Sequence, residues 1–320
     1  MKPRLLFLAS LVAFFTINVA FGETFNVTSP EEFQSALTEA QSNGEDDTIN
    51  VAAGTYIITS TLHYISYEDS GHKLTIQGAG ADKTVLCTGI TDLVYIGTYG
   101  DVIIKGIEFE FKGRDGDDGG GIYVHGHSTN ITIKECRFWG NSAAYDNGAG
   151  VVAISDSGTI TIANNIFSEN SAYDDGGGVC VISDSDSATL NIYNNILFGN
   201  MANDGDDLYV YSEGSTVNLY NNDFSGNAEF DTGQSWDLYI TLTDNYHHAD
   251  NIQKDPQFVD PLNGDFHLKS KSPCIDRGNN SAPGLPDTDF EGNPRIVGSA
   301  PDIGADEYYI GSLYLFLTLK

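Results

Sequence analysis

Short segments in which apolar and polar residues alternate recur through the middle of the chain. This alternation is the pattern of a β-strand that buries one of its two faces. The four clearest copies are residues 131–133, 160–162, 190–192 and 217–219. Fainter copies begin at Leu74 and Val102, and no amphipathic-helix pattern lies within these repeats. The sequence therefore predicts an all-β fold.

Two further blocks recur in phase with these segments. A glycine-rich block begins at Gly119, Gly148 and Gly176, and the fourth copy has Asp206 and Asp207 in place of the glycines. A Phe-x-x-Asn block, with Leu for Phe in the third copy, occupies residues 138–141, 167–170, 197–200 and 224–227. Successive glycine-rich blocks begin 28 to 30 residues apart, so the chain is built from repeated units of that length.

A unit of this length cannot bury its own apolar face, so consecutive units must stack on one another. The β-branched and aromatic composition disfavours helical repeats. A propeller blade needs roughly 40 residues or more, and the leucine ladder of a leucine-rich repeat is missing. We therefore predict a right-handed parallel β-helix, a single-stranded solenoid of about seven or more coils between Thr48 and Asp244. Its coils should pair about 4.8 Å apart.

The turns and the ends of the solenoid have patterns of their own. Asn pairs recur at 164–165, 194–195 and 221–222. Asn tolerates the left-handed backbone of a sharp turn, and stacked Asn side chains can form a hydrogen-bonded ladder. Before the first coil, Ser29 and Glu32 form a capping box with a proline between them, which predicts a short capping helix. An irregular C-terminal cap is expected after the last coil.

The first 22 residues have the pattern of an export signal. Lys2 and Arg4 precede an apolar run, and residues 20–22 form a small-x-small cleavage site. An N-terminal membrane anchor is the alternative. Beyond the signal we expect three parts: the β-helix with its N-terminal cap at 23–245, a C-terminal region at 246–308 and an apolar tail at 309–320. That tail is about half as long as a membrane-spanning helix, so we expect no transmembrane span in the mature chain.

Charge and cysteine content exclude several classes of function. The chain has 45 acidic and 15 basic residues, a net charge of −30, which disfavours nucleic acid and anionic membranes as partners. Its four cysteines contain no CxxC pair, which argues against a zinc or thiol-redox motif. We expect them to be small buried apolar residues, with two disulfide bonds as the alternative. They are Cys87, Cys136, Cys180 and Cys274.

Two stretches resemble known bacterial families. The glycine-rich and Phe-x-x-Asn blocks at 119–227 resemble the repeat of chlamydial polymorphic outer membrane proteins. Residues 255–308, with Ser-Pro-Cys-Ile-Asp at 272–276 and Asp-Ile-Gly-Ala-Asp-Glu at 302–307, resemble the C-terminal region of choice-of-anchor proteins. The resemblance implies a β-helix of the pectate-lyase-like superfamily, secreted or displayed at the cell surface or outer membrane. Within this motif we expect Arg295 to be structural. The superfamily includes enzymes and non-enzymes, so the fold does not decide activity.

One corner of the predicted coils is lined with acidic residues, just before the glycine-rich blocks. Stacked carboxylates repel one another, and a bound Ca²⁺ would remove that repulsion by using their oxygens as ligands. The candidate ligands are Asp117, Asp118, Asp146, Asp174, Asp175, Asp206 and Asp207. The alternative is a solvated acidic edge that discourages aggregation. We expect a second acidic column to consist of solvated turns, at Asp156, Asp184, Asp186 and Glu213.

Aromatic residues in turn or outward positions could bind sugars by stacking on their apolar faces. The candidates are Trp139, Tyr145, Tyr173 and Trp236. The alternative is that these side chains pack against neighbouring coils.

His125 and His127 follow an Asp-Asp pair in an order that loosely resembles polygalacturonases. However, Ser128 follows where that family has Gly, and no Arg-x-Lys element occurs downstream, so we do not predict that activity. No other convincing pair of catalytic acid and base is found. We therefore expect a non-catalytic exported protein for adhesion or for binding a polysaccharide or cell-surface glycan. The alternative is a divergent Ca²⁺-dependent polysaccharide lyase or glycoside hydrolase.

Overall fold

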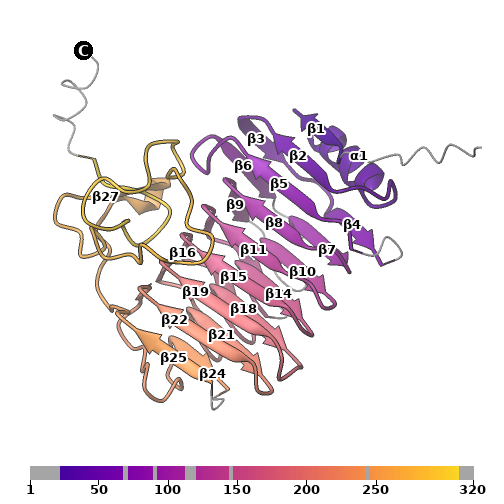
Figure 1. Ribbon diagram of the computed structural model, residues 1–320. Coiled ribbons are helices and arrows are strands. Elements are labelled where there is room, and N and C mark those ends of the chain that lie inside the picture. The colour runs from indigo at the N-terminus through magenta and orange to yellow at the C-terminus, as the bar shows by residue number, and fades with distance from the viewer. Residues whose placement is uncertain are drawn as a thin grey trace, which may run out of the picture.

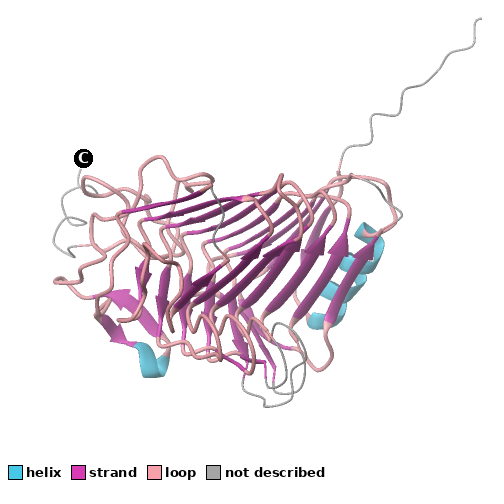
Figure 2. Cartoon of the chain, turned by 90° about the horizontal axis from the view of Figure 1, so that it is seen from below, coloured by secondary structure: helices cyan, strands magenta, loops and turns pink. Residues whose placement is uncertain are grey.

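The computed structural model describes residues 22–67, 71–88, 92–111, 120–143, 147–241 and 245–309. Over these ranges the chain winds into one elongated solenoid of short parallel strands, with three sheets along its sides (Figure 1). We call the sheets A, B and C, in the order in which the chain visits them in each turn. Figure 2 shows the strands stacked along the length of the solenoid, with the helix at one end.

The strands of the three sheets are short, and their bounds follow in stacking order. Sheet A contains β1 (Thr24–Val27), β2 (Asp47–Val51), β5 (Leu74–Gly78), β8 (Val102–Lys105), β11 (Ile131–Lys134), β15 (Thr159–Ala163), β19 (Thr189–Tyr193), β22 (Thr216–Tyr220) and β25 (Tyr246–Ala249). Sheet B contains β3 (Gly54–Ile57), β6 (Thr84–Thr88), β9 (Glu108–Phe111), β12 (Arg137–Trp139), β16 (Ile166–Ser168), β20 (Ile196–Phe198) and β23 (Asp223–Phe224). Sheet C contains β4 (Leu62–Ser66), β7 (Val94–Thr98), β10 (Ile122–Gly126), β14 (Val151–Ser155), β18 (Val179–Ser183), β21 (Leu208–Ser212) and β24 (Leu238–Ile240).

Two small strand pairs lie outside these sheets. They are β13 (Ser142–Ala143) with β17 (Ser171–Ala172), and the antiparallel hairpin of β26 (Phe258–Asp260) and β27 (Asp265–Leu268) around the 3₁₀-helix η1 (Pro261–Asn263).

The repeat of the sequence is the repeat of the solenoid. The alternating segments form sheet A, the glycine-rich blocks lead into sheet C, and the Phe-x-x-Asn blocks begin in sheet B. Equivalent residues of consecutive units are direct partners in parallel pairs, as in β11 with β15 and β10 with β14. The chain completes six turns between the first and the seventh strand of sheet C. These features confirm the predicted parallel solenoid.

Alternate side chains of each strand point into the solenoid and form its core. In β10, Ile122 and Val124 are fully buried, whereas Tyr123 and His125, which alternate with them, are partly exposed. Phenylalanines stack on one another inside sheet B. Phe138 and Phe167 of the Phe-x-x-Asn blocks have ring centroids 4.8 Å apart, and Phe109 of the preceding coil lies 4.9 Å from Phe138. Burying one such side chain stabilises the fold by about 1.5–3 kcal/mol.

The two members of each Asn pair have different roles. The first member takes the left-handed backbone of the turn between sheets A and B, with φ of 57° at Asn164 and 55° at Asn194. The second member forms a buried ladder, in which Asn165 Nδ2 donates to Asn195 Oδ1 at 3.0 Å and Asn195 Nδ2 donates to Asn222 Oδ1 at 3.0 Å. Both predicted uses of Asn, in the turn and in the ladder, are therefore confirmed.

The Asn of the Phe-x-x-Asn block forms a second buried ladder, at the corner between sheets B and C. Asn141 Nδ2 donates to Asn170 Oδ1, and Asn170 Nδ2 donates to Asn200 Oδ1, both at 2.8 Å. The glycines of the adjoining block allow the coils to approach, since a Cβ on Gly150 would lie 2.4 Å from the backbone oxygen of the next coil. The fourth unit keeps a glycine at the first position of this block. Gly205 there has a left-handed φ of 62°, like Gly148 and Gly176 in the earlier units.

A helix closes the first coil as the sequence predicts. In α1 (Pro30–Ala40), Ser29 Oγ accepts from the backbone N–H of Glu32 at 3.2 Å, and the Glu32 carboxylate accepts from the backbone N–H of Thr28 at 2.8 Å. Phe33 and Leu37 are fully buried against the first strands. The apolar face of the helix thus covers the end of the core.

At the other end, the loop between β23 and β24 covers the last coil. Its Phe230 packs edge-on against Phe224, at 5.6 Å between ring centroids, and its backbone oxygen accepts from the Tyr246 hydroxyl at 3.0 Å. The C-terminal region lies instead along the outer face of sheet B (Figure 1). The predicted irregular C-terminal cap is therefore a layer on the side of the solenoid. The outer face of sheet B needs this cover, because outward residues such as Ile166 and Ile196 are apolar.

A buried arginine holds the C-terminal region together. Arg295 is 1% exposed, and its guanidinium donates to the backbone oxygens of Asp302 and Gly304 at 2.6 Å and of Asp306 at 2.9 Å. Arg295 is therefore structural, as the sequence motif suggests.

All four cysteines lie in the described part of the chain, none forms a disulfide bond, and three of them are buried.

We expect the Asn ladder to carry a large share of the stability. Asn195→Ala should lower the free energy of unfolding by about 2–4 kcal/mol, because it leaves buried backbone and side-chain groups of two coils unpaired. Asn218→Ala is the matched control, since that half-buried side chain donates one bond on the outer face of sheet A. Urea denaturation of both variants checks this. Equal losses of stability would contradict a special role for the ladder.

Asp223 joins the last coil to the C-terminal region and should make stability depend on pH. It is fully buried, its carboxylate accepts from the backbone N–H of Lys254 at 2.9 Å, and Cys274 Sγ lies 3.1 Å away. Burial raises its pKa to about 6. Between roughly pH 4 and 6 the folded chain therefore holds a proton that the unfolded chain has lost, and the contribution of this group to stability falls as pH rises.

Asp223→Asn should remove this contribution. Between pH 4 and pH 7, the unfolding free energy of the variant should rise by about 2–2.5 kcal/mol relative to that of the wild type. Urea denaturation at four pH values measures the difference. A difference that stays constant over this range would show that Asp223 titrates normally.

Candidate functional site

The outer face of sheet C carries a column of ring-bearing side chains. Tyr95 of β7 and Tyr123 of β10 are direct partners, and their rings stack with centroids 5.0 Å apart and an angle of 3° between their planes. His63 of β4 continues the column at 5.7 Å from Tyr95. Because strands of a parallel sheet are about 4.8 Å apart, residues in register stack in this way.

A second group of rings lies at the carboxyl ends of the same strands. Tyr67 and Tyr99 meet edge to face at 5.5 Å, and both rings lie beside His127, at 6.0 Å and 5.2 Å. Tyr67 and Tyr99 are 37% and 43% exposed. Gly97 makes room for this arrangement, because a Cβ there would lie 2.3 Å from the Tyr67 hydroxyl.

Two imidazoles and one carboxylate complete this group. His125 and His127 lie on one side of β10 with ring centroids 4.5 Å apart, and His127 Nδ1 lies 2.6 Å from the carboxylate of Asp156. One ligand atom from each of the three residues lies within 4.8 Å of the others. Burial, and then the neighbouring imidazole, lower the pKa of His125. His125 therefore stays neutral at neutral pH and remains able to accept a hydrogen bond.

We call the group of Tyr67, Tyr95, Tyr99, Tyr123, His125, His127 and Asp156 the ring cluster. It combines planar apolar surfaces with hydroxyl, imidazole and carboxylate groups at their edges. Such a surface can stack on the apolar face of a sugar ring and hydrogen-bond its hydroxyl groups. A depression of about 590 Å³, lined by residues that include Gln41, Ile65 and Tyr67, adjoins the cluster.

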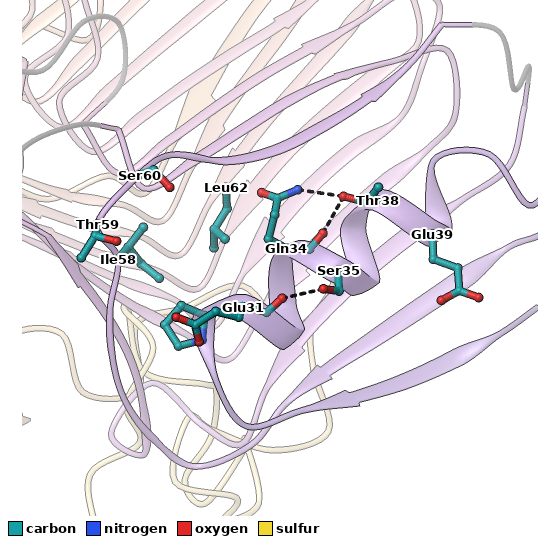
Figure 3. A pocket seen from close by; sticks show the side chains of 10 residues that line it. Glu31, Gln34, Ser35, Thr38, Glu39, Ile58, Thr59, Ser60 and Leu62 are labelled. Carbon is teal, nitrogen blue, oxygen red and sulfur yellow. Dashed lines mark hydrogen bonds between the residues drawn. The ribbon is translucent and has the colours of Figure 1, made fainter.

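A larger depression, of about 640 Å³, lies between α1 and the segment that leads into β4 (Figure 3). Its polar groups are largely engaged within the fold. The Ser35 hydroxyl donates to the backbone oxygen of Glu31, and the Gln34 amide donates to the Thr38 hydroxyl and to the backbone oxygen of His63. The bond from Gln34 to the backbone oxygen of His63 joins α1 to β4 beside this depression.

Comparison with known families agrees with this architecture. Residues 49–228, more than half of the chain, match the model of the right handed beta helix region. The chain belongs to this β-helix family. The fold fits the pectate-lyase-like superfamily, and no curated protein matches the chain. Over the described residues, no helix of the β-helix protein is both long enough and apolar enough to span a membrane.

The acidic corner of the β-helix contains residues in different environments. Asp207 is fully buried, and its carboxylate accepts from Asn200 Nδ2 at 2.8 Å and from the backbone N–H of Ser225 at 2.7 Å. Asp206 accepts from the backbone N–H of Ala202 at 2.6 Å. Burial raises the pKa of both carboxyl groups, that of Asp207 most strongly. Asp207 thus ends the second Asn ladder.

The remaining predicted calcium ligands are more exposed or are not described. Asp174 is exposed and Asp175 is half-buried. Asp117, Asp118 and Asp146 lie outside the described residues.

The predicted aromatic residues that the structure describes lie in different environments. The Trp139 ring is half-buried and packs edge-on against Phe266 of the C-terminal region, with centroids 5.8 Å apart. Tyr173 and Trp236 are 71% and 73% exposed, beside the turns that lead into sheet C. Tyr145 lies outside the described residues. The tyrosines of the ring cluster were not among the predicted residues.

One signal in the sequence could have located the ring cluster. Asp156 follows His127 by 29 residues, which is one repeat, so the two side chains must be neighbours on consecutive coils. Asp156 lies in a turn with its side chain 47% exposed, and its carboxylate also contacts His127. Tyr67 and Tyr99 precede the clearest repeats, and their position in register was therefore hard to recognise.

The role of Asp207 can be tested separately from metal binding. Asp207→Ala should lower the unfolding free energy by about 2–4 kcal/mol, equally in Ca²⁺ and in EDTA, because it leaves two buried donors unpaired. The exposed Asp174→Ala serves as control and should change stability by less than about 0.5 kcal/mol. Thermal or urea unfolding measures both. A loss seen only in Ca²⁺ would instead identify Asp207 as a metal ligand.

Proposed function

We propose that this β-helix is an exported protein that binds a glycan through the ring cluster on sheet C, without cleaving it. The observation that carries the proposal is the contiguous set of rings around Gly97, with Tyr67 and Tyr99 open to solvent. Isolated exposed aromatic residues are common on proteins, but a group of touching rings with polar edges is a feature of binding surfaces. The export pattern at residues 1–22 and the resemblance to choice-of-anchor proteins support a location outside the cell.

The shape of this surface suits an extended chain. The ring columns run along the stack, across β4, β7 and β10, rather than into a deep pocket. The row of Tyr67, Tyr99 and His127 continues with Asp156 and then, on the following coils, with Asp184 and Glu213. Because these carboxylates would repel an acidic polysaccharide, we propose a neutral glycan as the ligand.

One observation favours a second candidate, an enzyme that cleaves the glycan. The Asp156 carboxylate lies 2.6 Å from His127 Nδ1, which is the arrangement of an imidazole base oriented by a carboxylate. A lyase or hydrolase of this kind would use His127 as base, and Ca²⁺ at the acidic corner remains a possible cofactor for it.

Glycan binding should depend on the ring cluster and not on Tyr173, which is exposed outside the cluster. Tyr99→Ala should weaken binding to an insoluble or soluble neutral polysaccharide about tenfold, because one stacking surface is lost. Tyr173→Ala is the matched control and should leave affinity unchanged. Affinity electrophoresis and pull-down with a panel of neutral and acidic polysaccharides measure the effect. Loss of binding in Tyr173→Ala alone would move the site to the acidic corner.

The same panel separates binding from cleavage. Incubation with and without Ca²⁺, followed by assays for reducing ends and for unsaturated products, should show neither product. Products that disappear in His127→Gln would establish the enzyme instead of the binding protein.

A further inference from the structure

His267, in β27, lies between two carboxylates. Its Nδ1 is 2.6 Å from Asp265 Oδ1, and its Nε2 is 3.3 Å from Glu291 Oε1. Burial lowers the pKa of this imidazole, but the hydrogen bond with Asp265 and the nearby carboxylates outweigh it and raise the pKa. The hydrogen bond at Nδ1 also fixes the orientation of the ring, so Nε2 points toward Glu291.

A third carboxylate adjoins this pair from inside the fold. Asp306 is 2% exposed, and one oxygen accepts from the backbone N–H of Leu268 at 3.2 Å. Its other oxygen, Oδ1, is buried and has no hydrogen-bond partner among the described residues. Such an orphaned buried oxygen costs free energy unless something binds it. Burial raises the pKa of Asp306 to about 7.

The three groups come from separate segments of the C-terminal region and converge on one point. One ligand atom each of His267, Glu291 and Asp306 lies within 4.8 Å of the others. The guanidinium of Arg137 lies nearby, but it is paired with Glu108 and stacks on Phe266 and Phe290. It forms no ion pair with the carboxylates of Glu291 and Asp306 among the described residues.

We propose that His267, Glu291 and Asp306 form a binding site for a divalent transition-metal ion of the Zn²⁺ type. His267 would supply Nε2, the two acidic residues would supply one carboxylate oxygen each, and Asp265 would orient the imidazole. An imidazole with carboxylates suits Zn²⁺ or Mn²⁺, whereas Ca²⁺ and Mg²⁺ prefer oxygen ligands alone. The site is independent of the proposed glycan binding.

Bound metal would hold three segments of the C-terminal layer together. It would join β27, the loop that carries Glu291 and the segment that carries Asp306. The loop is also tied to the solenoid, because Lys83 Nζ donates to the backbone oxygen of Glu291 at 2.8 Å.

The cluster of His125, His127 and Asp156 is the natural comparison. There too the three ligand atoms lie within 4.8 Å of one another, but all three residues are half-buried and none has an orphaned buried oxygen. The Asp156 oxygen nearest to His127 is already held by Nδ1 of that ring. His127 therefore provides the matched control for His267.

The test uses the full exported chain, stripped of metal with EDTA and dialysed. Isothermal titration with Zn²⁺ should show one equivalent bound, with much weaker binding of Ca²⁺. Glu291→Gln should lower the Zn²⁺ affinity at least tenfold, and Asp265→Asn about 10- to 100-fold, as expected for a residue that orients a ligand. His127→Gln should bind Zn²⁺ like the wild type. Zn²⁺ should raise the melting temperature of the wild type and of His127→Gln, but not of Glu291→Gln.

Several results would overturn the site. They are no Zn²⁺ binding by the wild type, unchanged affinity in Glu291→Gln, or loss of binding in His127→Gln. Glu291 is half-buried at the surface, so its variant should fold, which circular dichroism checks before titration. As a spectroscopic readout, Co²⁺ should give ligand-field absorption in the wild type that Glu291→Gln lacks.

Discussion

Each coil of the solenoid obtains its backbone hydrogen bonds from the coil before it and the coil after it, in register. Because the repeat is 28 to 30 residues, equivalent residues of neighbouring units become direct partners on all three sheets. Side chains of the same type therefore lie above one another on consecutive coils. Inside, this produces the phenylalanine stack and the two Asn ladders. Outside, the same register aligns Tyr95 with Tyr123 and His127 with Asp156.

The outer faces of sheets B and C differ in what covers them. The outward residues of sheet B include the apolar Ile166 and Ile196, and the C-terminal layer covers them with Phe266, Leu268 and Ile303. The outward residues of sheet C combine rings with polar groups and carry no such layer over the described residues. The surface that we propose for glycan binding is therefore a ring-bearing face that the fold leaves accessible.

The two histidine–carboxylate clusters show how different environments change the use of similar residues. At the ring cluster, the carboxylate and the imidazole satisfy one another at a half-buried surface, which suits hydrogen bonding to a ligand. In the C-terminal layer, three segments bring acidic groups around one imidazole, and one buried oxygen of Asp306 has no hydrogen-bond partner in the described part of the chain. A metal ion would supply the missing charge there, because burial makes an uncompensated carboxylate costly.

Much of the architecture follows from the sequence alone. The repeat length, the alternation of apolar residues, the Asn pairs and the capping box at Ser29 predict the parallel solenoid, its turns and its first helix, because each is a local pattern repeated in phase. The position of the C-terminal layer, the burial of Asp207 and the convergence of His267, Glu291 and Asp306 depended on tertiary structure. The contacts of the C-terminal layer join segments without a common repeat, so no spacing in the sequence encodes them. Which of the many acidic side chains become buried is decided by tertiary packing alone.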